Sequence, residues 1–140
     1  MNHPIALKNL FFTRIVVIAM AEHVPNAEKT IQIAPVTSLD IKKNEDAEDE
    51  YTVGMRVLFN QEGDSSVPYL IDMECFSVFK IDVNIDLNEI QKHLTMTGHS
   101  VVYGAVREAV LWITARQPYG PLTLGLSILK PPPIIEVNEK

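Results

Sequence analysis

Four histidines and one cysteine are the residues of this sequence best suited to metal binding or catalysis. The histidines are His3, His23, His93 and His99, and none follows the HxH or HExxH spacing of metal sites. Ser100 directly follows His99, but neighbouring residues at a helix start do not face each other, which disfavours a nucleophile–base pair. Cys75 stands in a strand-like run without a basic neighbour to activate it. The sequence therefore predicts a protein without catalytic residues, metal or cofactor.

Composition and charge exclude several other classes of protein. The 140 residues are 46% hydrophobic and 21% charged, which is typical of one globular domain. The net charge of −6 and the absence of a basic stripe argue against nucleic acid. The apolar run at residues 15–21 lacks a signal-peptide pattern and is too short to cross a membrane. A single cysteine allows no internal disulfide. We therefore expect a cytoplasmic protein that does not insert into membranes.

Four segments have the composition of β-strands. The first covers residues 7–20, and both of its alternating faces are largely apolar, so each should be covered by a helix or by a neighbouring subunit. A Pro-Asn-Ala turn at residues 25–27 precedes two short alternating runs in residues 30–42, broken at Pro35. Residues 51–60 alternate most clearly, and Gly63-Asp64 predicts a hairpin into residues 67–79. The four strands are predicted to form an antiparallel meander.

Two helices are predicted after the strands. Asp86 and Glu89 fit a capping box for a helix over residues 87–96 that ends near Gly98. Ser100 is placed to cap a second helix that reaches residue 116 before Pro118. We expect an α+β fold, a four-stranded antiparallel sheet with C-terminal helices packed on one face. The domain should cover residues 1–130, and residues 131–140 should form an extended tail.

Several of these segments together resemble the SecB family of protein-export chaperones. Tyr103-Gly104 followed by Arg107-Glu108, an apolar helix, Arg116 and Tyr119 matches the C-terminal signature of that family. Two strand motifs agree with it as well, namely Met55-Arg56-Val57 and Tyr69-Leu70-Ile71-Asp72. The resemblance covers most of the chain. It implies a SecB-like fold, a homotetramer built as a dimer of dimers, and binding of unfolded client polypeptides without ATP.

The same resemblance implies a docking surface for the SecA translocase motor. In the SecB family this surface is acidic and lies on the sheet, where Leu70 and Asp72 match it and Glu74 shares the strand face of Asp72. The two acidic residues that the family carries on the first strand are replaced here by Ala19 and His23. The partner-docking residues predicted from the sequence are therefore Leu70, Asp72 and Glu74.

Client contact and oligomer contact are assigned to other side chains. The residues predicted to contact client polypeptides are Phe76, Phe79, Tyr103, Trp112 and Tyr119. Core packing is the competing interpretation for each of them, and Phe76 and Phe79 fall on opposite faces of a regular strand. The predicted oligomer contacts are Arg107, Glu108 and Leu111. A SecB-like adaptor or toxin–antitoxin chaperone for one partner, and a small enzyme or ligand-binding protein, are the alternatives.

Overall fold

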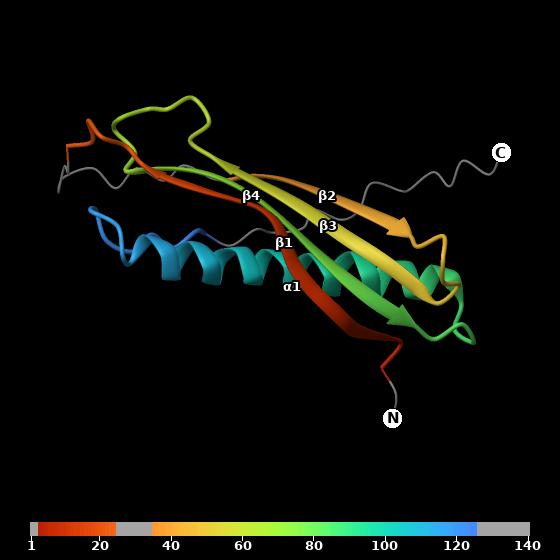
Figure 1. The fold of residues 1–140 in the computed structure, drawn as a ribbon. Helices are drawn as coiled ribbons and strands as arrows, with labels where there is room; N and C mark the ends of the chain where they lie inside the picture. Colours follow the sequence, from red (N-terminus) through yellow and green to blue (C-terminus); the bar gives the residue numbers. More distant parts are fainter. Residues whose placement is uncertain (1–2, 25–34, 126–140) are drawn as a thin grey trace.

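A computed structural model shows one sheet with one long helix packed against one of its faces (Figure 1). The structure describes residues 3–24 and 35–125. The elements are β1 (Ile5–Ala19), β2 (Val36–Lys43), β3 (Glu50–Phe59), β4 (Tyr69–Ile81) and α1 (Leu87–Thr114). The predicted α+β class with a four-stranded antiparallel sheet is confirmed. The predicted turn at residues 25–27, residues 30–34 of the second predicted strand and the tail at 131–140 lie outside the described residues.

The strand order is β1-β4-β3-β2, so the predicted simple meander is wrong for the first strand. Strands β2, β3 and β4 follow one another, but β1 lies at the far edge beside β4. The lengths give a physical reason, because β1 has 15 residues and can pair along all 13 residues of β4, whereas β2 has only 8. β1 and β2 thus form the two edges of the sheet.

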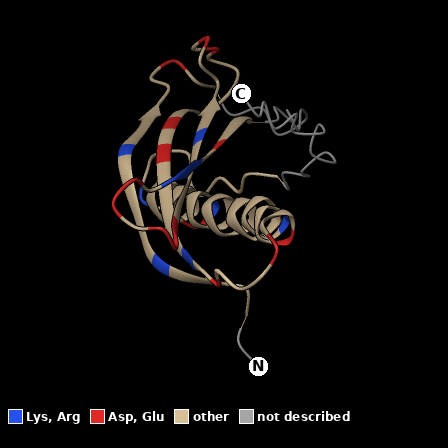
Figure 2. Cartoon of the chain, turned by 90° about the vertical axis from the view of Figure 1, so that its right-hand side faces the viewer, with Lys and Arg blue, Asp and Glu red and all other residues tan. Residues whose placement is uncertain are grey.

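The core lies between α1 and the inner face of the sheet, which is the face that carries alternate residues of β4. These β4 residues are Tyr69, Ile71, Met73, Cys75 and Phe79, and all five side chains are buried. They pack against residues of β3 and α1 that are equally buried. Figure 2 shows the sheet on one side of the helix, with the outer face of the sheet turned away from it.

The helical region is one continuous helix, which corrects the prediction of two. Gly98, expected to end a helix, lies inside α1 and faces Val53, and Ser100 donates its hydroxyl to the Met96 carbonyl oxygen instead of capping a new helix. Asp86 occupies the N-cap position without a side-chain hydrogen bond, so the capping box does not form. Among the described residues, no helix is long and apolar enough to cross a membrane.

The helix is continuous at Gly98 because a glycine lets it approach the sheet closely. A Cβ atom at position 98 would stand 2.9 Å from Cγ2 and 3.0 Å from Cγ1 of Val53, a fully buried side chain. The glycine is therefore a packing requirement and not a helix terminator, although glycine usually costs a helix about 1 kcal/mol relative to alanine.

This contact predicts opposite effects for two glycines of one helix. Gly98→Ala should lower the free energy of unfolding by about 1–3 kcal/mol, because the added methyl group overpacks the contact with Val53. Gly104→Ala is the matched control, since nothing lies within 4 Å of its added Cβ, and it should raise stability by up to about 1 kcal/mol. Urea unfolding of both variants measures this, and stabilisation by Gly98→Ala would contradict the packing argument.

Candidate polypeptide-binding surface

Strand β1 presents apolar side chains on the inner side of the sheet that α1 does not cover. α1 packs mainly under β3 and β4, the two central strands, and less under β1 and β2. Leu7, Leu10 and Ile15 pair in register with buried residues of β4, yet all three are exposed, and Ile15 is 53% exposed. Apolar side chains that lie on the core-facing side of a sheet are therefore open to solvent along its edge.

The outer side of β1 is also apolar, and its best-defined contact is an aromatic pair. Phe11 stacks against Phe76 of β4, with ring centroids 5.8 Å apart and an interplanar angle of 26°. The Phe76 ring lies over Gly54 of β3, where a Cβ atom would come within 2.5 Å of its Cε1. Only a glycine at position 54 leaves room for this ring to lie flat on the sheet.

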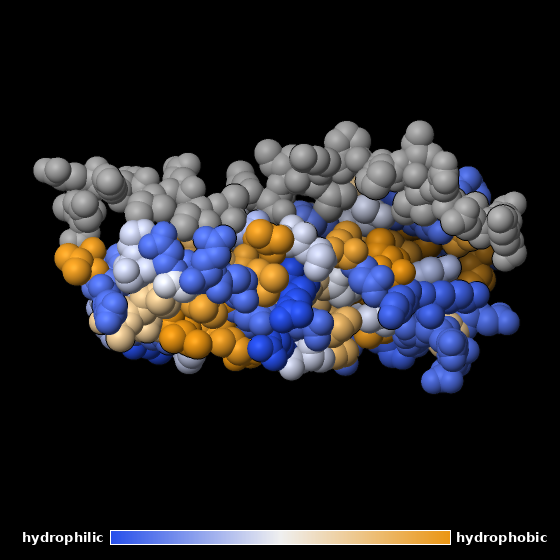
Figure 3. All heavy atoms as spheres, turned by 90° about the horizontal axis from the view of Figure 1, so that it is seen from above, coloured by the Kyte–Doolittle hydropathy of each residue, from blue (hydrophilic) through white to orange (hydrophobic). Residues whose placement is uncertain are grey.

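A second apolar area lies further along the outer face. Ile18 of β1 pairs with Leu70 of β4, and Ile18 is 51% exposed. Figure 3 looks down on this side of the molecule and shows apolar atoms on both sides of a hydrophilic band near the middle. Ile18, together with Leu7, Leu10, Phe11 and Ile15, gives β1 two apolar faces, as the sequence predicted, and all five side chains are accessible. The coverage also predicted for them is not supplied by the helix of the same chain.

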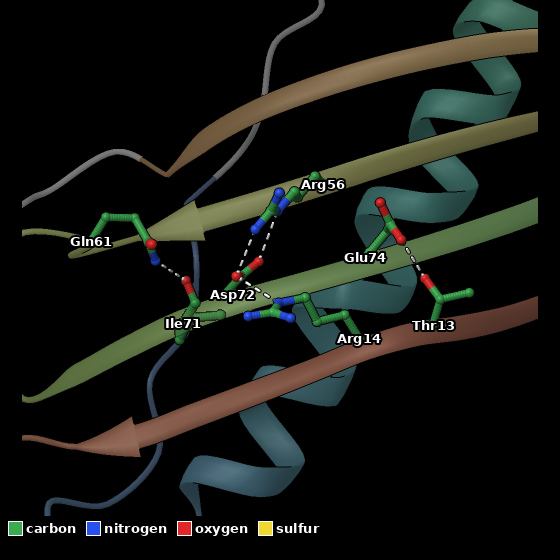
Figure 4. A network of polar contacts seen from close by, with 7 residues as sticks. All are labelled: Thr13, Arg14, Arg56, Gln61, Ile71, Asp72 and Glu74. Carbon is green, nitrogen blue, oxygen red and sulfur yellow. Dashed lines mark hydrogen bonds and ion pairs between the residues drawn. The ribbon is translucent and has the colours of Figure 1, made fainter.

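An ion-pair cluster centred on Asp72 lies on the outer face, between Leu70 and Phe76 of β4. Arg14 Nε donates to Asp72 Oδ2 at 2.7 Å, and Arg56 donates from Nε to Oδ1 at 3.0 Å and from Nη2 to Oδ2 at 2.9 Å (Figure 4). The Asp72 side chain is only 7% exposed, whereas those of Arg14 and Arg56 are 52% and 47% exposed. Hydrogen bonds from Arg56, then from Arg14, hold the pKa of Asp72 below its ordinary value.

The three residues predicted to dock a partner lie together on the outer face. Leu70, Asp72 and Glu74 alternate along β4, and Thr13 of β1 donates its hydroxyl to Glu74 Oε1 at 2.6 Å. Asp72, however, is buried beneath two arginines that neutralise it, and only Glu74 leaves part of its carboxylate accessible. The expected acidic surface is therefore mostly balanced by cations.

The five residues predicted to contact clients do not form one surface. Phe76 lies on the outer face, and Trp112 is 60% exposed on α1, where the Arg116 guanidinium stacks 3.8 Å from the ring centroid. Phe79 and Tyr103 are buried in the core. Tyr119 is half-buried and donates its hydroxyl to the Met20 carbonyl oxygen, beyond the end of β1. The apolar residues of β1 were not named as contacts, although its two apolar faces had indicated them.

The predicted oligomer contacts divide in the same way. Arg107 is half-buried, and its Nε donates to the Leu124 carbonyl oxygen at 2.9 Å, which fixes the segment after the helix. Glu108 and Leu111 are exposed on α1, on the side away from the sheet core. Arg107 therefore has a role within the subunit, while Glu108 and Leu111 are accessible to a neighbouring chain.

Cys75 and His99, two of the residues best suited to metal binding or catalysis, are buried side chains that pack within the subunit. Cys75 is fully buried, and burial raises the pKa of its thiol to about 11. His99 stacks on Tyr103 with centroids 5.9 Å apart, and burial lowers the pKa of the imidazole. In residues 3–24 and 35–125, no three His, Cys, Asp or Glu side chains come together as a metal site would require.

Comparison with known proteins identifies the fold. The structure matches the Mycobacterium tuberculosis Rv1957 SecB-like chaperone, solved in complex with a ChAD peptide from the Rv1956 HigA1 antitoxin, with a TM-score of 0.67 and 18% sequence identity over 92% of this chain and 93% of that chain. This chain has the SecB-like fold. No protein-family model and no curated protein match the sequence of this chain.

A second solved structure is similar over a comparable length. It is a protein of unknown function from Streptococcus agalactiae, with a TM-score of 0.52, 10% identity, and coverage of 87% of this chain and 97% of that chain. Chains with very different sequences thus share a similar fold. The predicted resemblance to SecB-like proteins is confirmed at the level of the fold.

The Asp72 cluster predicts a pH-dependent stability. Asp72→Asn should lower the free energy of unfolding by about 1–3 kcal/mol at pH 7, because a charge-assisted contact is lost. Because the folded pKa of Asp72 is depressed, its contribution is present above the unfolded value of about 4 and is lost as the pH falls below it.

Urea unfolding at pH values from 7 to 3 measures this effect. The difference between the wild type and Asp72→Asn should shrink as the pH falls through about 4. Asp40→Asn, an exposed carboxylate on the same outer face, is the control and should change stability little. If Asp72→Asn and the wild type are equally stable at pH 7, the cluster does not stabilise the fold.

Proposed function

We propose that this protein is a holdase chaperone that binds unfolded or partly folded polypeptides without ATP and without catalysis. The observation that supports this most directly is β1, whose apolar side chains are exposed on both faces of the sheet. Large exposed apolar patches on soluble proteins usually mark binding surfaces. The SecB-like fold agrees with the proposal, since one solved protein with this fold is a chaperone bound to a peptide. We place this activity in the cytoplasm.

One such surface is too weak to hold a client by itself. Burial of about 600 Å² of apolar area gains roughly 15 kcal/mol. Ordering about ten client residues costs on the order of 10–20 kcal/mol, so the net affinity of one surface is small. Several surfaces that hold one flexible chain raise the affinity without new types of contact. Holding therefore requires an oligomer, for which we propose a homotetramer arranged as a dimer of dimers.

The two sheet edges differ in a way that favours β1 over β2 for contact with a client. β2 is short and carries Asp40, Lys42 and Lys43, the kind of charged edge that discourages strand pairing. β1 is long and apolar, and it is interrupted only by irregularities near Lys8 and Thr13. We propose Glu108 and Leu111 of α1 as the contact between subunits, which leaves β1 open to a client.

Binding of one dedicated partner protein is a second candidate function. The Rv1957 chaperone was solved with a peptide from one antitoxin, and a chaperone of this type would bind one specific segment. Delivery of clients to the SecA motor would use Leu70, Asp72 and Glu74. The burial of Asp72 under two arginines, together with Ala19 at the end of β1 and His23 beyond it, makes this handover the less favoured route.

The holding proposal predicts a loss of function from charges on β1. The wild type should suppress aggregation of several unrelated unfolding proteins at stoichiometric amounts without ATP. Ile15→Asp with Ile18→Asp should reduce this at least severalfold, because a buried, unpaired carboxylate opposes apolar contact. Leu87→Asp is a control of similar exposure at the start of α1 and should retain activity. Protection of one protein alone would support the dedicated partner instead.

The assembly proposal predicts a mass near four chains. Light scattering at micromolar concentration measures it, and Leu111→Asp should lower the mass without unfolding the subunit, because this side chain is exposed. Met96→Asp, at an exposed site nearer the start of the helix, is the control and should leave the mass unchanged. A monomer at this concentration would contradict the proposed tetramer.

A further inference from the structure

The outer face of the sheet carries charges in two layers. The strand register places the cations Lys8, Arg14, Lys42, Arg56 and Lys80 and the anions Asp40, Glu50, Asp72 and Glu74 on this face. Every one of these cations is about half exposed or more, whereas Glu50 and Asp72 are largely buried beneath their partners. The chain as a whole has a net charge of −6, yet this face presents mainly cations to solvent.

The two arginines of the Asp72 cluster retain unused donors. Arg14 binds Asp72 through Nε only, and Arg56 uses Nε and Nη2. Among the described residues, both terminal amino groups of Arg14 and the Nη1 group of Arg56 have no hydrogen-bond partner. Glu74, which pairs in register with both arginines, accepts a hydrogen bond from Thr13. The buried Asp72 therefore holds two guanidinium groups in place while leaving their outer N–H groups open.

Apolar side chains lie on both sides of these donors. Along β4, Leu70 is two residues from Asp72 and Phe76 is four residues away in the other direction, which corresponds to about 7 Å and about 13 Å. Ile18 extends the first apolar area, and Phe11 stacks on Phe76 in the second. Glu74 lies between the arginines and Phe76, and its carboxylate accepts the Thr13 hydroxyl. Along β4 the outer face thus has an apolar area, the two arginines, the Thr13–Glu74 pair and a second apolar area.

We propose that this part of the outer face binds an acidic segment of a polypeptide, with one carboxylate on Arg14 and Arg56 and one apolar side chain on each flanking area. The proposal deepens the proposed function, on which it rests, by naming the chemistry of the segment bound on this face. Arginine N–H groups and carboxylates form the stronger class of charge-assisted hydrogen bonds. The aliphatic flank of Ile18 and Leu70 and the net charge of −6 favour a polypeptide over a nucleic acid, and a free anion could use neither flank.

Labelled synthetic peptides test the inference directly. The probe is an extended peptide with a leucine two residues before a single glutamate and a phenylalanine four residues after it, made in both chain directions. Matched peptides carry glutamine or lysine in place of the glutamate. Fluorescence anisotropy with the full-length protein should show about tenfold weaker binding of the glutamine peptide and still weaker binding of the lysine peptide. The preference should diminish in high salt.

Two variants test whether Arg14 is responsible for the preference for the glutamate peptide. Arg14→Gln leaves both Arg56 bonds to Asp72 in place, so the variant should fold, and it should bind the glutamate and glutamine peptides within about threefold of each other. Lys42→Gln removes a cation at the β2 edge of the same face and should leave the preference intact. Thermal unfolding of both variants verifies that they are folded.

Three results would overturn the inference. These are equal binding of the three peptides, tighter binding of the lysine peptide, or an unchanged glutamate preference in Arg14→Gln. Each leaves the proposed function standing if the wild type still suppresses aggregation of unfolding proteins. If the protein prefers the glutamate peptide but suppresses no aggregation, the acidic-segment site stands and the proposed holdase function is contradicted.

Discussion

One helix covers a sheet that is wider than the helix, and the rest of the structure depends on this mismatch. α1 lies under β3 and β4, where Gly98 allows the backbone to approach Val53 and the central side chains are fully buried. An α-helix with its side chains is about 10–12 Å across, roughly the spacing of two to three strands. The edge strand β1 is therefore left with apolar residues that the subunit itself cannot bury. This uncovered apolar area is what a client would cover.

The Asp72 cluster organises the opposite side of the sheet. Because Arg14 and Arg56 come from different strands and bind one carboxylate, they link β1, β4 and β3 across the outer face. The cluster also separates the Phe11–Phe76 area from the Ile18–Leu70 area, so that no single continuous apolar patch covers the face. The charges thus keep an otherwise apolar surface solvated, and they supply a polar feature that a bound segment could recognise.

Local patterns were enough to predict the fold class. The alternation from Tyr51 to Phe59 and the late position of the helical segments predicted a sheet with helices on one face, and the structure confirms this. The break at Gly98 was misread, because glycine ends helices and also permits close packing, and only the position of Val53 distinguishes the two. The place of β1 beside β4 was equally hidden, since strand order depends on pairing between distant segments.

The candidate site was predicted only in part for the same reason. The alternation along β4 correctly placed Asp72 and Glu74 on one face, which Leu70 shares. The burial of Asp72 could not be inferred, because Arg14 is 58 residues away in the sequence and becomes its neighbour only through the β1–β4 register. Tyr103 and Phe79 were assigned to client contact from residue type alone, whereas their burial follows from the packing of α1 on the inner face.

Hydrogen–deuterium exchange of the full-length protein, with and without a saturating unfolded client, tests most directly whether β1 is the client-binding surface. Backbone amides at an open sheet edge exchange readily, and they are protected when another chain covers them. We expect the protection added by the client to be greatest in peptides covering residues 5–19 and small in those covering residues 36–43. Protection confined to the β2 edge or to α1, with β1 unchanged, would contradict it.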